Sequence, residues 1–337
     1  MNIIGCDFHS RFQQIAMLDT ETGEIVERRL EHENGEARKF YGALSSPARI
    51  GIEATGYARW FERMLQEQKH ELWVGDAAQI RAAMVRKQKT DSRDALHILE
   101  LLLSNRFPKI YISKLEDRDV WQLLRHRCKL VRWQTSIRNQ LHALAMGEGV
   151  CRKKKLWSRG GRKELDSLSL DAWASRRRSD LLELLDRLAP CIQELDQAVE
   201  EAAKDCPAAV LLQRQAGVGP VTSLAFALMV GPVERFGNSR RLVSYVGLNP
   251  REESSGGKQR MGAISKQGNS MVRWLLLQAA QTASRYDEDL RRDYRRLVSR
   301  RGRAVAKVAI ARKLAVRLYW MLRQASEQLN AADSHAG

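Results

Sequence analysis

The sequence predicts a multidomain protein in which an N-terminal α/β domain precedes mostly helical domains. Strand-like and helix-like segments alternate over residues 1–105, whereas residues 115–205 contain helix-like segments only. Hydrophobic residues make up 44% of the 337 residues, which indicates a globular protein with at least one sizeable core. A chain of this length is expected to hold two or three domains.

Five strands are expected in the N-terminal region. The first three follow one another, with a turn at Gly23 between the second and the third. The later strands alternate with helices, which indicates a mixed sheet with helices packed on it. The expected strands are 2–9, 13–19, 24–32, 48–54 and 71–76, and the expected helices are 36–44, 57–68, 77–85 and 91–103.

The middle region, residues 115–205, is expected to be helical throughout. Seven apolar residues recur there at steps of four and three, which favours a coiled coil or a long helical hairpin. An amphipathic helix packed within one chain is the alternative. Pro190 lies inside this seam and should kink the helix or mark a helix start. The seam residues are Leu181, Leu185, Leu188, Ile192, Leu195, Val199 and Ala202.

The C-terminal region contains a glycine turn between two expected helices. Residues 212–231 resemble a helix-hairpin-helix, in which backbone N–H groups at the turn hold a DNA phosphate; a plain helical hairpin is an equally good interpretation. Further helices are expected at 239–248, 269–284 and 304–325. Seven arginines lie between the last two, at residues 291–303, and suit contact with a nucleic-acid backbone.

The composition favours a nucleic-acid partner. The formal net charge is +17, from 57 Lys and Arg against 40 Asp and Glu. The five cysteines form no CxxC pair, which argues against a disulfide framework or a zinc site. Without an evident secretory leader or an apolar run long enough for a bilayer, we expect a cytoplasmic protein with no membrane partner.

Two carboxylates follow glycines on apolar strands. Side chains alternate between the faces of a strand, so Asp7 shares a face with Gly5, and Glu53 shares one with Gly51. If the two strands are neighbours, Asp7 and Glu53 lie side by side and repel unless a cation sits between them. Oxygen ligands of this kind suit Mg²⁺. The alternative is that each is an ordinary polar strand end.

Two more carboxylates lie at the start of an expected helix. Asp91 and Asp94 are three residues apart, so they share one face of that helix. The alternative is helix capping, with Asp91 as the N-cap and Asp94 at the third helical position. Together with Asp7 and Glu53, they suggest a two-metal centre for phosphoryl transfer.

A pair of serines lies in the segment "REESSGGKQRMG", residues 251–262. Ser254 or Ser255 is either a nucleophile or part of a flexible surface turn, and the local sequence does not decide between these. Basic residues near this pair and in the glycine-broken segment 151–163, which also holds Trp157, suit phosphate contact and stacking; exposed, solvated segments are the alternative. The candidate phosphate ligands are Arg152, Lys153, Lys154, Lys155, Lys258, Arg260 and Lys266.

The motifs together resemble a known family. The order of Asp7, Glu53 and the "TDSRDA" pair is similar to the RuvC-like (RNase H-like) DEDD domain. The segments "GVGPVTS", "YVGLNPREESSGGKQRMGAISKQGN" and "VRWLLL" resemble the transposase domain of the insertion-sequence one-ten family, whose members are bridge-RNA-guided recombinases. The resemblance implies a RuvC-like domain at 1–110, a coiled-coil linker at 111–205 and a transposase domain at 206–330.

The resemblance also implies a mechanism. The carboxylates of Asp7, Glu53, Asp91 and Asp94 would hold Mg²⁺, and a serine before a glycine would attack a DNA phosphate and become covalently linked to it. Ser255 is the first choice for this nucleophile and Ser254 the second. A structured non-coding bridge RNA would pair with donor and target DNA. Family members combine carboxylates and serine from different subunits, which implies a homo-oligomer, a dimer that becomes a tetramer during synapsis.

Two other functions remain open. A hydrolytic transposase or junction endonuclease would keep the four carboxylates and use water as the nucleophile. A non-catalytic nucleic-acid-binding scaffold would use the carboxylates only as helix caps and strand ends. A covalent protein–DNA adduct would distinguish the serine mechanism from the hydrolytic one. A requirement for Mg²⁺ would distinguish both enzymes from the scaffold.

Overall fold

The computed structural model describes residues 2–84, 90–151, 155–252 and 261–335, with side chains up to residue 331 except that of Met261. These form two compact units, residues 1–112 and 113–337. The first unit ends close to residue 110, the predicted end of the N-terminal domain. The predicted division of the remainder after residue 205 stays a prediction.

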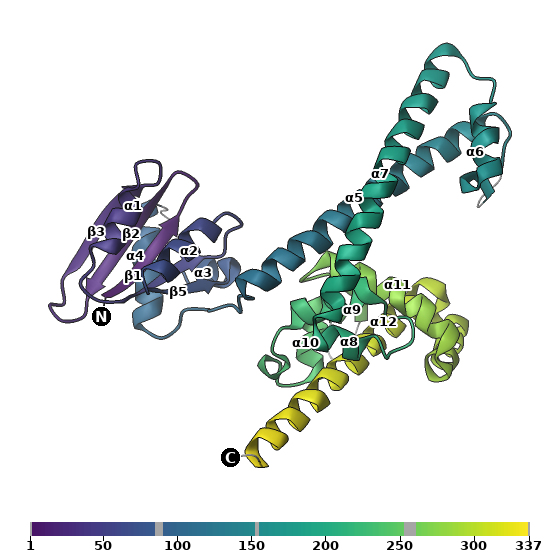
Figure 1. Ribbon diagram of the computed structural model, residues 1–337. Coiled ribbons are helices and arrows are strands. Elements are labelled where there is room, and N and C mark those ends of the chain that lie inside the picture. Colours follow the sequence, from purple (N-terminus) through teal and green to yellow (C-terminus); the bar gives the residue numbers. More distant parts are fainter. Residues whose placement is uncertain (1, 85–89, 152–154, 253–260, 336–337) are drawn as a thin grey trace. The chain divides into compact units, whose positions relative to one another are not determined.

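The first unit is built on a five-stranded mixed sheet with the strand order β3-β2-β1-β4-β5 (Figure 1). The first three strands pair antiparallel, whereas β4 runs parallel to both β1 and β5. All five predicted strands are therefore confirmed, as is the mixed sheet. Their bounds are β1 (Asn2–Phe8), β2 (Phe12–Asp19), β3 (Ile25–Glu31), β4 (Ala48–Glu53) and β5 (Glu71–Gly75).

Helices cover both faces of this sheet. The apolar side chains of Ile4, Cys6 and Phe8 pack on one face with residues of α1 and α2. Helix α4 lies on the opposite face, where Ala95 and Leu99 pack against the sheet. The helices of the unit are α1 (Glu36–Gly42), α2 (Arg59–Glu67), α3 (Ala77–Ala82) and α4 (Asp91–Leu103), each within a predicted helical range.

Two glycines set the close contact between α4 and the sheet. Gly5 and Gly51 are directly paired on β1 and β4. A Cβ atom at Gly5 would lie 2.2 Å from the carbonyl oxygen of Ala95, and one at Gly51 would lie 2.8 Å from Cδ1 of Leu102. Only glycine therefore lets the helix approach these strands, two residues before each of the strand-end carboxylates.

Replacing Gly5 by alanine is expected to destabilise the first unit by about 2 kcal/mol or more, because the added methyl group meets helix backbone that has no room to move. Gly56→Ala is the matched control, since a Cβ there meets nothing within 4 Å, and it should change stability by less than about 0.5 kcal/mol. Urea unfolding of both variants measures the difference. Equal stability of the two would contradict the close helix–sheet contact.

The second unit is mostly helical and contains two apolar cores. One core lies among α8–α12 and the adjoining ends of α5 and α7, and the other lies among the far ends of α5 and α7 with α6 (Figure 1). Its elements are α5 (Leu115–Gly147), η1 (Lys155–Trp157), α6 (Arg159–Asp166), α7 (Ala172–Lys204), α8 (Pro207–Leu212), α9 (Pro220–Val230), η2 (Val233–Arg235), α10 (Ser239–Val246), β6 (Pro250–Glu252), β7 (Met261–Ile264), α11 (Ser270–Tyr286) and α12 (Glu288–His335).

The predicted apolar seam packs within this chain. Helix α7 lies along α5, with Leu181, Leu185 and Val199 buried and an ion pair of 2.7 Å between Arg127 and Asp196. This is the arrangement of a long helical hairpin, in which four of the seven seam residues are buried and the other three are half-buried. Helix α7 continues through Pro190, so of the two predicted alternatives the helix start is wrong, and a kink at this proline stays a prediction.

Three segments of the second unit differ from prediction. The arginines of residues 291–303 lie in helix α12, which is broken at Gly302 (φ 78°), and not between helices. The basic segment after residue 154 forms η1 and α6, where Trp157 is partly buried against the far core. The segment around the serine pair is flanked by an antiparallel strand pair, β6 with β7, because Pro250 pairs with Ile264.

The predicted glycine turn is confirmed, with helix boundaries that differ from the prediction. Helix α8 ends at Leu212, Gly217 adopts φ 85°, and α9 begins at Pro220 after the extended N-cap residue Gly219. Within the residues that the structure describes, no helix combines the length and the apolar character that crossing a membrane requires.

Candidate active site

The ends of two neighbouring parallel strands bring the first two carboxylates together. Cys6 pairs with Ile52 in the register of β1 and β4, so Asp7 and Glu53 come next along the two strands. Both line one cavity of about 350 Å³ on the side of the sheet that α4 covers. The predicted strand neighbourhood and the shared face are therefore confirmed.

Helix α4 brings the other two carboxylates to the same end of the sheet. Asp94 lines the cavity with Asp7 and Glu53, and its Oδ1 atom is buried. The N-cap of α4 is Thr90, whose extended backbone lets its hydroxyl accept a hydrogen bond from the N–H of Arg93. The interpretation of Asp91 as the N-cap is therefore wrong, and Asp91 is the first helical residue.

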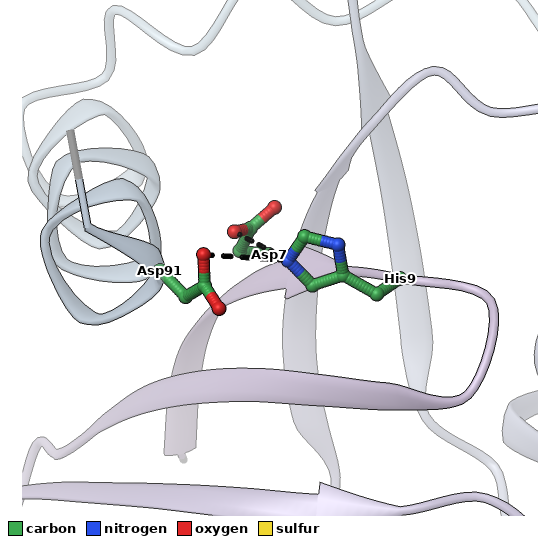
Figure 2. A group of neighbouring side chains, drawn as sticks. All are labelled: Asp7, His9 and Asp91. Carbon is green, nitrogen blue, oxygen red and sulfur yellow. Dashed lines mark hydrogen bonds and ion pairs between the residues drawn. The ribbon is translucent and has the colours of Figure 1, made fainter.

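A histidine joins Asp7 to Asp91. Nε2 of His9 lies 3.0 Å from Oδ2 of Asp7 and 3.7 Å from Oδ1 of Asp91 (Figure 2). The three side chains offer ligand atoms within 4.8 Å of one another, which is compact enough for one metal ion. No spacing in the sequence demands a role for His9, although alternation along the strand places it on the same face as Asp7.

Burial and like charge both act on Asp7. Burial raises the pKa of the Asp7 carboxyl above its ordinary value, and the carboxylates of Asp94 and Asp91 raise it further, against the opposing effect of His9. The side chain of Asp7 is 19% exposed, compared with 48% for Asp91. A cation among these oxygens would relieve both the desolvation and the repulsion.

An arginine that the sequence did not single out holds Glu53. Nη2 of Arg81, on α3, donates to Oε1 of Glu53 at 3.0 Å, and both residues line the cavity. The Arg81 side chain is 70% exposed, so the pair contributes at most about 1 kcal/mol and a competing cation can displace it. No local pattern predicts this contact, because 28 residues separate the two partners.

The serine pair, Ser254 and Ser255, lies outside the described residues, as do the basic candidates Lys258, Arg260 and the run from Arg152 to Lys154. The backbone on both sides of residues 253–260 is paired in β6 and β7. Of the remaining candidates, Lys155 is exposed at the start of η1, and Lys266 is exposed with φ 57°.

Two family profiles match the chain. One, described as "Transposase IS116/IS110/IS902 family", matches residues 209–295, which include the serine pair. The other, described as "Transposase" and named after the DEDD enzymes of the IS110 group, matches residues 4–147, which include the four carboxylates.

Several curated proteins are similar over most of this chain. A "Probable family 20 transposase" of Pseudomonas aeruginosa is 29% identical over 95% of this chain and 96% of its own length. The transposase for insertion sequence element IS1111A of Coxiella burnetii is 31% identical over 71% of this chain and 67% of its own length. The transposase for element IS1328 of Yersinia enterocolitica is 26% identical over 83% of this chain and 85% of its own length.

Proposed function

Because the chain belongs to the IS116/IS110/IS902 family of transposases, we propose that it recombines DNA through a metal-assisted serine attack guided by a bridge RNA. The observation that carries this proposal is the gathering of Asp7, Glu53 and Asp94, from three separate elements, around one cavity, with Asp91 joined to Asp7 through His9. The strand order β3-β2-β1-β4-β5, with α4 against β1, supports an RNase H-like, RuvC-like domain.

The residues around the cavity fit Mg²⁺. Four carboxylates supply the oxygen ligands that this ion prefers, and three of them line a space open enough for a substrate phosphate. When bound, Mg²⁺ would polarise the scissile phosphate and lower the cost of ionising the attacking hydroxyl. Asp7, Glu53, Asp91 and Asp94 would hold it, while the hydrogen bond from His9 orients the Asp7 carboxylate.

In the proposed reaction the hydroxyl oxygen of Ser255 attacks the DNA phosphorus. A bond forms between Oγ and phosphorus, the serine proton leaves to a base, and the bond from phosphorus to one sugar oxygen breaks; that oxygen takes up a proton. The phosphoserine ester keeps the energy of the broken bond, so a sugar hydroxyl from the exchanged strand can reverse the step without ATP. The paired strands β6 and β7 would anchor the segment that carries this serine.

The guide RNA and the oligomer are further parts of this proposal. The net charge of +17 and the family resemblance support a second polyanion beside donor and target DNA. Because four residues of the α7 seam are buried within this chain, we expect an oligomer to form mainly through other surfaces. A non-coding segment beside the gene, with loops complementary to the element ends and the insertion site, is the expected observation; its absence would contradict RNA guidance.

The experiment that tests the reaction combines the full-length protein with its RNA and DNA substrates. We expect a protein–DNA adduct that survives denaturing electrophoresis, forms with Mg²⁺ and does not form with EDTA. Mg²⁺-dependent cutting without any adduct would favour the hydrolytic transposase or endonuclease instead. Cutting that proceeds equally well without Mg²⁺ would contradict the proposal that the carboxylates hold this ion.

Replacing Arg81 by glutamine is expected to strengthen Mg²⁺ binding up to about fivefold, because the variant removes a cation that competes for Glu53. The measurement is the rise of the melting temperature as Mg²⁺ is titrated. Arg38→Gln is the matched control, since Arg38 forms an exposed pair with Glu67 in the same unit. Weaker Mg²⁺ binding in Arg81→Gln alone would show that Arg81 supports the site.

A further inference from the structure

A groove of about 800 Å³ lies in the second unit, and none of the four carboxylates lines it. One wall is the exposed face of α5, and the other is the N-terminal end of α11, from Gly268 to Met271. Both walls of the groove belong to the same compact unit. Nothing in the proposed reaction uses its residues.

The α5 wall is basic. Arg125, Lys129 and Arg132 recur at steps of four and three, so they project from one face of the helix, and all three are exposed. No aspartate or glutamate occurs between Val120 and Gly147. Within the part of the chain that the structure describes, these three cations form no ion pair with a carboxylate, although Lys129 lies 5.1 Å from the ring centre of Trp133.

Other arginines of the same unit form ion pairs with carboxylates on their own helices. Arg176 pairs with Asp180, Arg187 with Glu183 and Arg323 with Glu327, each four residues apart. The α5 row has no such partners, so its charges repel one another and are left available for a polyanion.

We propose that this groove binds the phosphate backbone of double-stranded DNA. The rise from Arg125 to Arg132 is about 10 Å along the helix, and three phosphate steps of one DNA strand rise by about the same amount along the DNA axis. The positive end of the α11 dipole faces the same space and adds to the attraction. Double-stranded DNA is the occupant because transposases act on DNA, so this inference rests on the family assignment but not on the serine reaction.

The groove would also position the DNA. Its α11 wall starts at Gly268, a few residues after β7 ends at Ile264, and Nη1 of Arg273 donates to the carbonyl oxygens of Gln267 and Val246. This arginine fixes the backbone between β7 and α11. Duplex held in the groove therefore runs close to the strand pair that flanks the serine segment.

The salt dependence of DNA binding tests this groove. In the full-length protein, the triple variant Arg125→Gln, Lys129→Gln, Arg132→Gln should reduce the magnitude of the negative slope of log K against log salt by about two to three between about 50 and 200 mM KCl. The probe is a short fluorescent DNA duplex in EDTA, read by anisotropy. The control triple, Arg176→Gln, Arg187→Gln, Arg323→Gln, removes the same charge elsewhere and should change the slope by less than about one.

Equal slope changes in the two triples would overturn the proposal. If the triple variant unfolds at too low a temperature, the single variants Arg125→Gln and Arg132→Gln replace it. Each is expected to reduce the magnitude of the slope by about 0.9. A duplex RNA of the same sequence forms the second arm, and a loss confined to RNA would overturn the assignment to DNA. Because binding is measured without Mg²⁺, failure of the serine reaction leaves this result unaffected, and the reverse also holds.

Discussion

Ser255→Ala is expected to lower formation of the covalent protein–DNA adduct by more than about a thousandfold, because the variant lacks the oxygen that bonds to phosphorus. DNA binding should stay within about twofold of wild type, since the substitution removes no charge. Denaturing electrophoresis of the reaction with labelled DNA measures the adduct, and anisotropy measures binding. Ser254→Ala should still form the adduct.

Ser265→Ala is the matched control for this experiment. Its hydroxyl donates to Oδ1 of Asn249 at 2.9 Å, beside the same strand pair, so its loss changes local packing without removing the proposed nucleophile. If Ser254→Ala loses the adduct and Ser255→Ala keeps it, the nucleophile is one residue earlier than proposed. If both single variants keep the adduct, the serine mechanism is wrong in this segment.

Asp7→Asn should change activity and stability in opposite directions. Loss of a carboxylate from the cavity is expected to lower Mg²⁺-dependent cutting by more than about 100-fold, since loss of an outer-shell partner alone costs 10–100-fold. In EDTA at pH 7, the same variant should melt at a higher temperature than wild type. A neutral amide keeps the contact with His9 and removes the buried charge that Asp91 and Asp94 repel.

The stability gain of Asp7→Asn should depend on pH. The folded pKa of Asp7 lies above its unfolded value, so the folded state holds its proton more tightly. This contribution to stability is fully present below the unfolded pKa, near 3.9 for Asp, and is lost as the pH rises through the folded pKa. The difference in melting temperature between wild type and Asp7→Asn should therefore shrink on acidification.

Glu67→Gln is the control for these measurements, because Glu67 lies in an exposed pair with Arg38 outside the cavity. It should leave cutting unchanged and alter the melting temperature little. Cutting at the wild-type rate by Asp7→Asn would instead contradict the role of Asp7 as a ligand of the catalytic metal ion. A lower melting temperature of Asp7→Asn in EDTA would show that the contact with His9 outweighs burial and repulsion.

The N-terminal unit was predictable because its elements obey local periodicity. Side chains alternate along β1 and β4, so the faces of Asp7 and Glu53 followed from counting residues. The predicted helices were found because each repeats its apolar residues at helical spacing. The arginine-rich segment before Gly302 was missed because a run of charges gives no apolar period, although arginine itself favours helix.

Contacts between distant segments could not be predicted in this way. The pairing of β6 with β7 flanks a segment with no strand pattern of its own, and the hydrogen bond from Arg81 to Glu53 joins α3 to β4. The basic row on α5 is visible in the sequence. Its groove exists only because α11 begins opposite that row.

The sequence alone determined the types of side chain, the periodicity of the elements and the family resemblance. Those properties depend on each residue and its near neighbours along the chain. Tertiary structure alone decided that α4 packs against Gly5 and Gly51, that Asp94 joins Asp7 and Glu53 around one cavity, and that His9 contacts Asp91. These contacts depend on strand register and helix packing, which bring together residues that no local pattern relates.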